Sequence, residues 1–362
     1  MKKTTHNTGR ITLMDVARES GFSASTVSIV LNDAPLSRYV AVKTKQHIRE
    51  VAKRMGYRPD AFARSLRSRR SRTIGIMVFD LSDPYCTLIL KGIQRSLYTT
   101  SYLPFIMDAH NQAQQFERYL EMLLERRVEG LIVVANWLFI DIRPLADLAR
   151  QQIPTMLIGR EMRSSPISSV MVDNKIGGYD AMRHLYELGH REIAIIRGPE
   201  QLVDSQPRWE GIVQFCSEVG LKLNPAHIVD LSDTSDPNSG FEEGYRFTKM
   251  LAGQKEQFSA LVAFDDLTAF GAIRALHEAG REIPSDCSVI GFDDVPHAAH
   301  SSPGLTTVRQ PMEQMGEIAA NYILKAIDAV RGQVELPSEA ILMPPAVVVR
   351  ESTAAYRQPV LS

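Results

Sequence analysis

The sequence predicts an all-α helix-turn-helix headpiece followed by an α/β core of two doubly wound parallel-sheet subdomains. Three observations predict this fold class. Two short amphipathic segments flank a glycine turn near the N-terminus, residues 1–72 carry a net charge of +11 against −12 for the rest, and apolar strands alternate with amphipathic helices from Thr73 onward. A chain of 362 residues with 44% hydrophobic content is long enough for more than one domain. The charge asymmetry indicates a basic nucleic-acid-binding end joined to an acidic globular body.

Residues 11–32, ITLMDVARESGFSASTVSIVLN, carry the helix-turn-helix pattern. Thr12 is an expected N-cap of the first helix, and Gly21 supplies the left-handed conformation of a tight turn. The second helix is expected from about Ser25, burying Val27, Val30 and Leu31 and leaving outward Ala24, Ser25, Thr26, Ser28 and Ile29. Such a second helix can enter the DNA major groove. Any helical hairpin on a protein surface is the alternative interpretation of this stretch alone.

A loop without helical periodicity is expected at 33–39, followed by a third helix over about 42–55 that ends at Gly56. Residues 57–72, YRPDAFARSLRSRRSR, then combine apolar residues with a cluster of arginines. Asp60 can cap a helix there that is too short to be stable alone in water. The stretch is either a flexible basic linker or a segment that folds only against DNA and a partner copy.

The core is expected to contain two series of strands and helices, and therefore two parallel sheets. The first series has strands at 73–79, 103–109, 130–135 and 154–159, with helices near 85–100, 112–127 and 141–152. The second has strands at 169–173, 192–198, 227–231, 260–265 and 288–294, with helices near 175–189, 206–219, 239–252 and 266–279. Ligands of such sheets bind at the carboxyl ends of the strands.

Several function classes lack their motifs. The chain has no G-x-G-x-x-G after the first strand, no Walker loop, no H-E-x-x-H and no G-x-S-x-G, so we expect no catalytic residues, no cofactor and no metal. Cys86, Cys216 and Cys287 are too far apart for a zinc motif, and His184 and His190 suit packing or solvation better than metal binding. No signal peptide or membrane-spanning run is present, which predicts a soluble, cytoplasmic protein with no membrane partner.

Polar residues at the strand ends suggest a small-molecule pocket. The candidates for ligand binding are Asp83, Tyr85, Arg160, Arg208, Asp265 and Asp293. Carboxylates that accept from hydroxyls, an arginine that donates to oxygens and a tyrosine face describe a sugar pocket. For any one of these residues a surface salt bridge or a helix cap is the ordinary alternative.

Together these features resemble the lactose-repressor family of bacterial transcription regulators. The motifs that carry the resemblance are TLMDVARESGFSASTVSIVLN, GYRPDAFARSLRS, SRTIGIMVFD, DN at 173–174, LGHREIAIIRGP, RWEG at 208–211, SVIGFDDV and LTTVRQP at 305–311. The resemblance implies a DNA-binding headpiece at 1–58, a hinge helix and linker at 59–72, and at 73–362 an effector-binding and dimerisation core like periplasmic sugar-binding proteins. It places subdomain one at about 73–165 and 305–333, and subdomain two at about 166–304 and 334–352.

The resemblance also implies roles for single residues. It assigns base reading to Ala24, Ser25 and Ile29, phosphate contacts to Thr26, Ser28 and Asn32, minor-groove insertion to Leu66, and further DNA contacts to Thr12, Tyr57 and Arg64. The six polar residues at the strand ends match positions where family members contact effector. Implied partners are a near-palindromic double-stranded DNA operator, a small-molecule effector, and further copies of the chain in a homodimer or tetramer.

Three departures from the family pattern affect this interpretation. Ile29 stands where arginine is common and cannot read guanine bidentately, so the operator is expected to differ. The loop after Asn32 is longer than usual, and Ala41 replaces a serine that often caps the third helix. Asp265 stands where asparagine is usual, which makes that corner acidic. The expected function is a transcriptional repressor controlled by a sugar; a purine or other non-sugar effector, or a solute-binding protein, is the alternative.

Overall fold

The computed structural model describes residues 11–58, 70–135, 145, 148, 151–162, 165–232, 239–254 and 257–357. The chain divides into two compact units, Met1–Ser71 and Arg72–Ser362, and each is described by itself below. Within the described residues, no helix is long and apolar enough to cross a membrane. The expected hinge helix, with Asp60, Arg64 and Leu66, lies outside the described residues, as does the expected helix at 141–152 apart from Leu145, Leu148 and residues 151–152.

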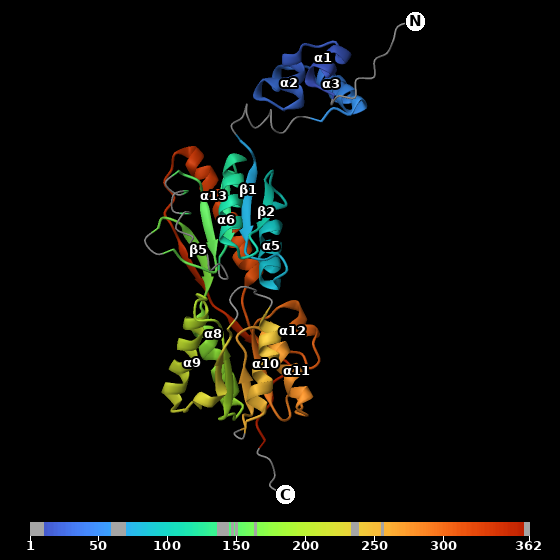
Figure 1. Cartoon of the computed structure of the whole chain (residues 1–362). Coiled ribbons are helices and arrows are strands. Elements are labelled where there is room, and N and C mark those ends of the chain that lie inside the picture. The colour runs from blue at the N-terminus through green and yellow to red at the C-terminus, as the bar shows by residue number, and fades with distance from the viewer. Residues whose placement is uncertain are drawn as a thin grey trace. The chain divides into compact units, whose positions relative to one another are not determined.

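The described part of the N-terminal unit contains three α-helices, α1 (Leu13–Ser20), α2 (Ala24–Leu31) and α3 (Val42–Met55) (Figure 1). Thr12 caps α1 in a capping box with Asp15, and Gly21 ends the helix at φ 74°, so the predicted cap and turn are confirmed. The three helices enclose a small core of fully or nearly fully buried side chains. Its members are Val16, Ala17, Val27, Val30, Ile48, Val51 and Ala52.

Two features between α2 and α3 bear on the sequence expectations. The stretch expected to lack helical structure contains a short 3₁₀ helix, η1 (Pro35–Tyr39), because Pro35 at its first position has a backbone already suited to a helical start. Ala41 precedes α3 without a side-chain capping bond. Thus the first turn of α3 lacks the side-chain acceptor that a serine would supply.

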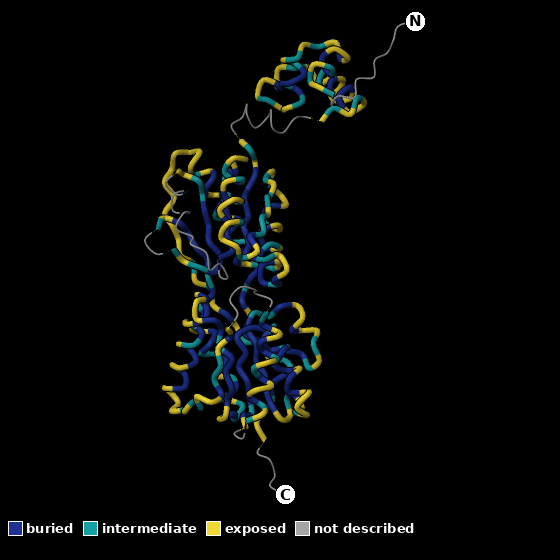
Figure 2. Tube along the Cα trace, viewed as in Figure 1, coloured by how far each residue is buried: buried dark blue, intermediate teal, exposed yellow. Residues whose placement is uncertain are grey.

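The first subdomain of the C-terminal unit is built on an all-parallel six-stranded sheet in the order β11-β5-β4-β3-β1-β2. Its strands are β1 (Thr73–Val78), β2 (Leu103–Asp108), β3 (Gly130–Val134), β4 (Thr155–Ile158), β5 (Ser168–Val172) and β11 (Ala340–Met343). Its described helices are α5 (Pro84–Leu97), α6 (Ala113–Glu125) and α13 (Met312–Gly332). The central strands are continuous apolar runs buried on both faces, as expected of a parallel sheet (Figure 2).

The second subdomain repeats the plan with the strand order β12-β10-β9-β8-β6-β7, in which only the β10–β12 pair is antiparallel. Its strands are β6 (Ile193–Arg197), β7 (Ile228–Asp230), β8 (Ala260–Val262), β9 (Ser288–Asp293), β10 (Thr306–Arg309) and β12 (Ala346–Val348). Its helices are α8 (Asn174–Glu187), α9 (Ser205–Val219), α10 (Gly240–Ala252), α11 (Asp266–Glu278) and α12 (Pro296–His300), with a 3₁₀ turn η2 (Pro225–His227).

The division between the two subdomains differs from the boundaries implied by the resemblance. Residues 168–172 form β5, which pairs with β4 and belongs to the first sheet, not the second. Conversely, β10 pairs with β9 in the second sheet, and β11 pairs with β5 in the first. The chain thus passes from one subdomain to the other after β5, β10 and β11. Sheet membership depends on hydrogen bonds between strands distant in sequence, which the order of elements alone does not reveal.

Candidate functional site

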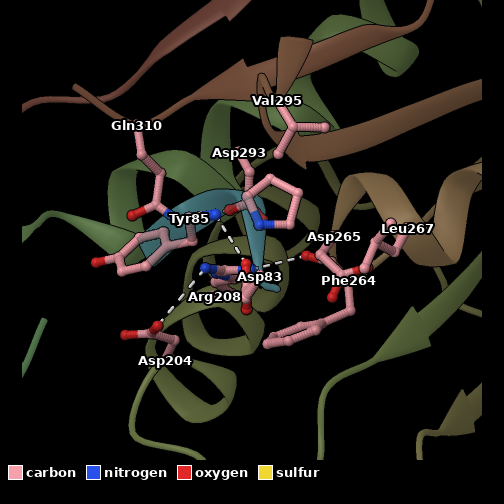
Figure 3. Close-up of a pocket in the computed structure, with 11 residues that line it drawn as sticks. Asp83, Tyr85, Asp204, Arg208, Phe264, Asp265, Leu267, Asp293, Val295 and Gln310 are labelled. Atoms are coloured by element: carbon pink, nitrogen blue, oxygen red, sulfur yellow. Dashed lines mark hydrogen bonds and ion pairs between the residues drawn. The ribbon is translucent and has the colours of Figure 1, made fainter. Parts of the chain in front are cut away.

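A cavity whose empty space, open solvent included, is about 430 Å³ lies between the two subdomains (Figure 3). Residues from both subdomains line it: Asp83, Pro84 and Tyr85 from the first, Asp204, Arg208, Phe264, Asp265, Leu267, Asp293 and Val295 from the second, and Gln310 from the segment between β10 and α13. The carboxyl ends of β1, β8 and β9 lead directly to several of these residues. The site is therefore at the strand ends, where open α/β sheets bind ligands.

Asp83 and Tyr85 are positioned by the start of α5. Asp83 is the N-cap, and its Oδ1 accepts a hydrogen bond of 2.7 Å from the backbone N–H of Tyr85. Burial raises the pKa of the Asp83 carboxyl to about 7, against the capping bond, and the negative charges of Asp265 and Asp80 raise it further. Tyr85 is itself buried, at 4% exposure. An aspartate that titrates near neutrality therefore faces the cavity from the first subdomain.

Asp265 is the corresponding helix cap in the second subdomain. It precedes α11, and its Oδ1 accepts a hydrogen bond of 2.7 Å from the backbone N–H of Thr268. Burial is the main cause of its raised pKa, while hydrogen bonds with Thr268 and the charge of Arg208 act in the opposite direction. Two capped helices, α5 and α11, thus each present an aspartate to the same cavity from opposite subdomains (Figure 3).

Arg208 is the one cation among the residues that line this cavity. Its Nε donates to Oδ1 of Asn174 and its Nη1 to the backbone oxygen of Phe264, both at 2.7 Å. Its guanidinium lies 3.7 Å from the ring centre of Phe292 and 4.5 Å from that of Phe264, and Nη2 is 3.7 Å from Asp204. At 7% exposure, the side chain is held rigidly by groups on several elements.

Close packing of α8 on α9 positions Arg208, which is on α9, at the cavity. A Cβ atom at Gly178 would lie 2.1 Å from the backbone oxygen of Arg208, and one at Gly211 would lie 1.9 Å from that of Lys175. Only glycine permits this approach of the two backbones. The motif R-W-E-G at 208–211 therefore combines the side chain that lines the cavity with the glycine that positions its helix.

Asp293 ends β9 in a strained backbone conformation. It has φ 116° and Asp294 has φ 60°, values that non-glycine residues adopt at an energetic cost of about 1–3 kcal/mol each. Asp293 Oδ1 accepts a 2.6 Å hydrogen bond from the side-chain amide of Gln310, and Asp294 accepts 2.6 Å bonds from Arg309 and Arg350. Burial raises the pKa of Asp293 well above its ordinary value, although the charge of Arg208 opposes this.

The structure brings together five of the six residues predicted for the effector site, namely Asp83, Tyr85, Arg208, Asp265 and Asp293. Arg160 follows β4 and the left-handed Gly159 and is not among the residues that line the cavity, so its part in effector binding stays a prediction. The turn at Gly159 redirects the chain immediately before it. Sequence reasoning missed Asp204, Phe264 and Gln310, although Phe264 precedes Asp265 directly and Asp204 lies one helical turn before Arg208.

In the N-terminal unit, α2 exposes only part of the face that was expected to contact DNA. Ser25 is exposed, and Ala24, Thr26 and Ile29 are half-buried. Ser28, expected to point outward, is buried at 8% exposure, and its backbone oxygen and Oγ accept bonds of 2.8 and 3.2 Å from the side chain of exposed Asn32. This burial follows from its place between Val27 and Val30 on a helix of only eight residues.

The remaining predicted DNA contacts lie at the ends of α1 and α3. The Thr12 hydroxyl donates to Asp15 at 2.6 Å, which holds it in the capping box. Tyr57 follows Gly56 and packs half-buried against the headpiece core. Arg64 and Leu66 lie outside the described residues.

Among the described residues, no group of three or more His, Cys, Asp or Glu is arranged to hold a metal ion. The interpretation of His190 as a packed residue is confirmed, since its ring nitrogens lie 2.9 Å from Oγ of Ser259 and 3.0 Å from Oγ of Ser288. The three cysteines are free and buried. The residues that line the cavity offer hydrogen-bonding groups, charges and aromatic rings.

Comparisons with known proteins agree with both parts of the chain. Residues 12–60 match the family model "Bacterial regulatory proteins, lacI family", and residues 182–353 match "Periplasmic binding protein-like domain". The chain is 34% identical over 346 residues to the HTH-type transcriptional repressor PurR of Erwinia tasmaniensis, covering 95% of this chain and 97% of that protein. It is 31% identical over 344 residues to PurR of Pectobacterium atrosepticum, with the same coverage.

Solved structures share the same architecture. The Lac repressor dimer bound to operator and the anti-inducer ONPF has a TM-score of 0.82 at 24% identity, covering 96% of this chain and all of that one. The complex of the transcriptional regulator CelR with cellobiose has a TM-score of 0.67 at 26% identity, covering 95% and 100%. A LacI family regulator from Enterococcus faecium with bound ribose has a TM-score of 0.66 at 27% identity, covering 79% and 100%. The predicted fold class is confirmed.

Proposed function

Because the chain belongs to the lacI family of bacterial regulatory proteins, we propose that a small ligand bound between its two core subdomains controls how tightly its headpiece binds operator DNA. The protein is a DNA-binding transcriptional repressor of this family. The observation that carries the proposal is the cavity to which both subdomains contribute polar side chains. A ligand bound there controls DNA binding only if its affinity differs between the arrangements of the chain that do and do not bind operator.

The headpiece reads DNA through α2 in this proposal. Ser25 and Ile29 supply a hydroxyl and an apolar surface to the bases, and Thr26 and Asn32 contact phosphates. Thr12, Tyr57 and Arg64 add contacts to the DNA backbone, Ser28 supports Asn32 from within, and Leu66 inserts into the minor groove at the operator centre. Residues 1–72 provide the basic charge that attracts the phosphates.

Two headpieces on one near-palindromic operator require a homodimer, as in the operator complex of the Lac repressor dimer. A repressor of this family acts on the bacterial chromosome, which places it in the cytoplasm. The experiment for this part is selection of binding sites from random DNA with the full chain, followed by measurement of the complex's mass. Paired half-sites and two chains per DNA are expected.

We propose a purine as the effector, in place of the sugar expected from the strand-end residues. Support comes from the relatives that match along nearly the whole chain, which are named PurR, a purine-responsive repressor. Tyr85 and Phe264 line the cavity with aromatic rings, which can pack on a planar base, and ionised carboxylates can accept from its N–H groups. The sugar remains the second candidate, because regulators solved with cellobiose and ribose share the fold at 26% and 27% identity.

Calorimetric titration of the full chain decides between the two ligand classes. The panel contains adenine, guanine, hypoxanthine and xanthine on one side, and ribose, glucose and cellobiose on the other. The proposal predicts that at least one purine binds and alters the affinity of the chain for its selected operator. Binding of a sugar with no response to any purine would overturn it.

A further inference from the structure

We propose that Asp266, which does not itself line the cavity, is a positioning residue for effector binding. It holds the turn that follows β9, and two residues of this segment, Asp293 and Val295, line the cavity (Figure 3). The inference rests on the proposed function, because it takes the cavity as the effector site. It adds a residue that acts on the effector only through its neighbours.

The turn after β9 has a backbone that needs support from its surroundings. Asp293 and Asp294 have φ values of 116° and 60°, which residues other than glycine rarely adopt. Conformations of this kind persist only where the surrounding structure fixes them. The groups that fix this turn therefore decide where the Asp293 carboxyl group lies.

Two backbone N–H groups of the turn are held through the carboxyl group of Asp266. The N–H of Val295 donates to Oδ2 of Asp266 at 2.9 Å, and the hydroxyl of Thr307 is hydrogen-bonded to Oδ1 at 2.5 Å. The oxygen of the same hydroxyl accepts a 3.4 Å hydrogen bond from the N–H of Asp294. Asp266 thus holds Val295 directly and Asp294 through Thr307.

Close packing of α11 on β9 brings Asp266 to this turn. Asp266 is the first residue of α11 and is fully buried, at 0% exposure. A Cβ atom at Gly291 would lie 2.4 Å from Oδ1 of Asp266 and 3.3 Å from its Cα, so a larger residue in β9 would displace the carboxyl group. Thr307 is the register partner of Gly291 in the β9–β10 pair. One carboxyl group therefore connects α11, the end of β9 and β10.

These contacts are compatible with either protonation state of Asp266. Burial raises the pKa of its carboxyl group well above the ordinary value, against the hydrogen bonds with Thr307 and Val295, and the charges of Asp265 and Asp294 raise it further. An ionised carboxylate accepts from both partners, whereas the neutral acid accepts from the Val295 N–H and donates to the Thr307 oxygen. An amide offers the same acceptor and donor, so asparagine is the conservative replacement.

The test is calorimetry on the full chain, at a temperature at which every variant is folded. The probe is adenine, guanine, hypoxanthine, xanthine, ribose, glucose or cellobiose, whichever binds the natural chain most tightly. Asp266→Leu keeps the size of the side chain but loses both contacts, and should weaken binding by about tenfold or more. Asp266→Asn should bind within about threefold of the natural chain. Thr307→Val is a milder change that removes only the hydroxyl, and it should weaken binding in the same direction.

Ser352→Ala is the matched control, because it removes two hydrogen bonds to the same strands, nearer their amino ends. The Ser352 hydroxyl donates to the backbone oxygen of Val289 at 2.6 Å and accepts from the N–H of Thr306 at 2.8 Å. This variant should lose stability but keep its affinity for the probe. Hydrogen exchange gives a second measurement, in which the Val295 amide should exchange faster in Asp266→Leu and at the natural rate in Ser352→Ala.

Three results would overturn the inference. In the first, Asp266→Leu binds the probe as tightly as the natural chain does, or its Val295 amide exchanges at the natural rate. In the second, Asp266→Asn binds as weakly as Asp266→Leu although the amide keeps both contacts. In the third, Ser352→Ala weakens binding as much as Asp266→Leu does, so that the loss follows from stability alone. A natural chain that binds none of the seven compounds would instead refute the proposed function, and the exchange of the Val295 amide would still test whether Asp266 holds the turn.

Discussion

The side-chain amide of Gln310 donates a 2.6 Å hydrogen bond to Oδ1 of Asp293, where the chain leaves the second subdomain for the first. The backbone N–H of Gln310 also donates to the carbonyl oxygen of Asp293, at 3.3 Å. Pro311 follows as the N-cap of α13, which packs on α5. A ligand that binds Asp293 would therefore contact a residue that is hydrogen-bonded to the segment between β10 and α13, one of the segments that join the two subdomains.

We expect Gln310→Leu to reduce the response of operator affinity to the effector more than it reduces effector binding. Leucine is similar in size but cannot donate a hydrogen bond to Asp293. Ligand binding at the Asp293 carboxyl group would then no longer be coupled to the segment between β10 and α13. The measurement is the ratio of operator dissociation constants with and without saturating effector, alongside calorimetry. The control is Gln206→Leu, since Gln206 contacts exposed Glu210 on the outside of α9. If Gln310→Leu left the ratio of operator dissociation constants unchanged, the hydrogen bond between Gln310 and Asp293 would have a structural role only.

Asp83→Asn should make the protein more stable at pH 8 and change little at pH 4. Burial raises the pKa of Asp83 from 3.8 to about 7, with Asp265 and Asp80 adding to the shift. The unfolded chain therefore loses this proton at lower pH than the folded chain, and the free energy of unfolding falls as pH rises from about 4 to 7. Asparagine keeps the cap on α5 but has no proton to lose.

Thermal unfolding at the two pH values measures this difference. In Asp83→Asn, Tm at pH 8 should rise by about 2–4 °C for each kcal/mol gained in the free energy of unfolding. Asp173→Asn changes a capping aspartate outside the cavity and should bring no such gain. Equal Tm values for Asp83→Asn and the natural chain at pH 8 would mean that the folded protein holds an ionised Asp83 at no cost.

Ile29→Arg should shift the preferred operator toward guanine at one position of each half-site. Arginine can donate two hydrogen bonds to a guanine edge, which is worth about 1–3 kcal/mol of discrimination, whereas isoleucine offers only apolar contact. Selection of bound sequences from randomised half-sites measures this change in base preference. Tyr98→Arg adds the same charge at an exposed position of the core and should leave the preferred sequence as it was. If Ile29→Arg preferred the same operator sequence as the natural chain, residue 29 would not contact the bases.

Removal of residues 1–72 should abolish operator binding and preserve effector binding. The remaining unit is compact and contains the whole cavity, whereas the basic surplus of the chain lies in the part removed. For the full chain, log K should fall with log salt by about 0.9 for each phosphate neutralised. An electrophoretic shift of the operator by residues 73–362 alone, equal to that by the full chain, contradicts the assignment of DNA binding to the headpiece.

Local features of the chain were predictable because their causes lie within a few residues. Thr12 meets its partner Asp15 three positions away, and Gly21 takes its left-handed conformation regardless of the core. The alternation of strands and helices also follows local apolar spacing, and most expected elements agree with the structure to within a few residues. Their membership in two sheets did not follow, because β5, β10 and β11 are assigned by pairing with distant strands.

By itself, the sequence determined the headpiece helices, the parallel-sheet core and the polar residues that end its strands, since spacing and capping act locally. Only the tertiary structure decided which of those residues meet. It placed Asp83 beside the cavity that Asp265 also lines and brought in Gln310 from the segment between β10 and α13. It also decided their chemistry, because burial raises the pKa values of Asp83 and Asp265, and burial depends on residues that lie far away in the chain.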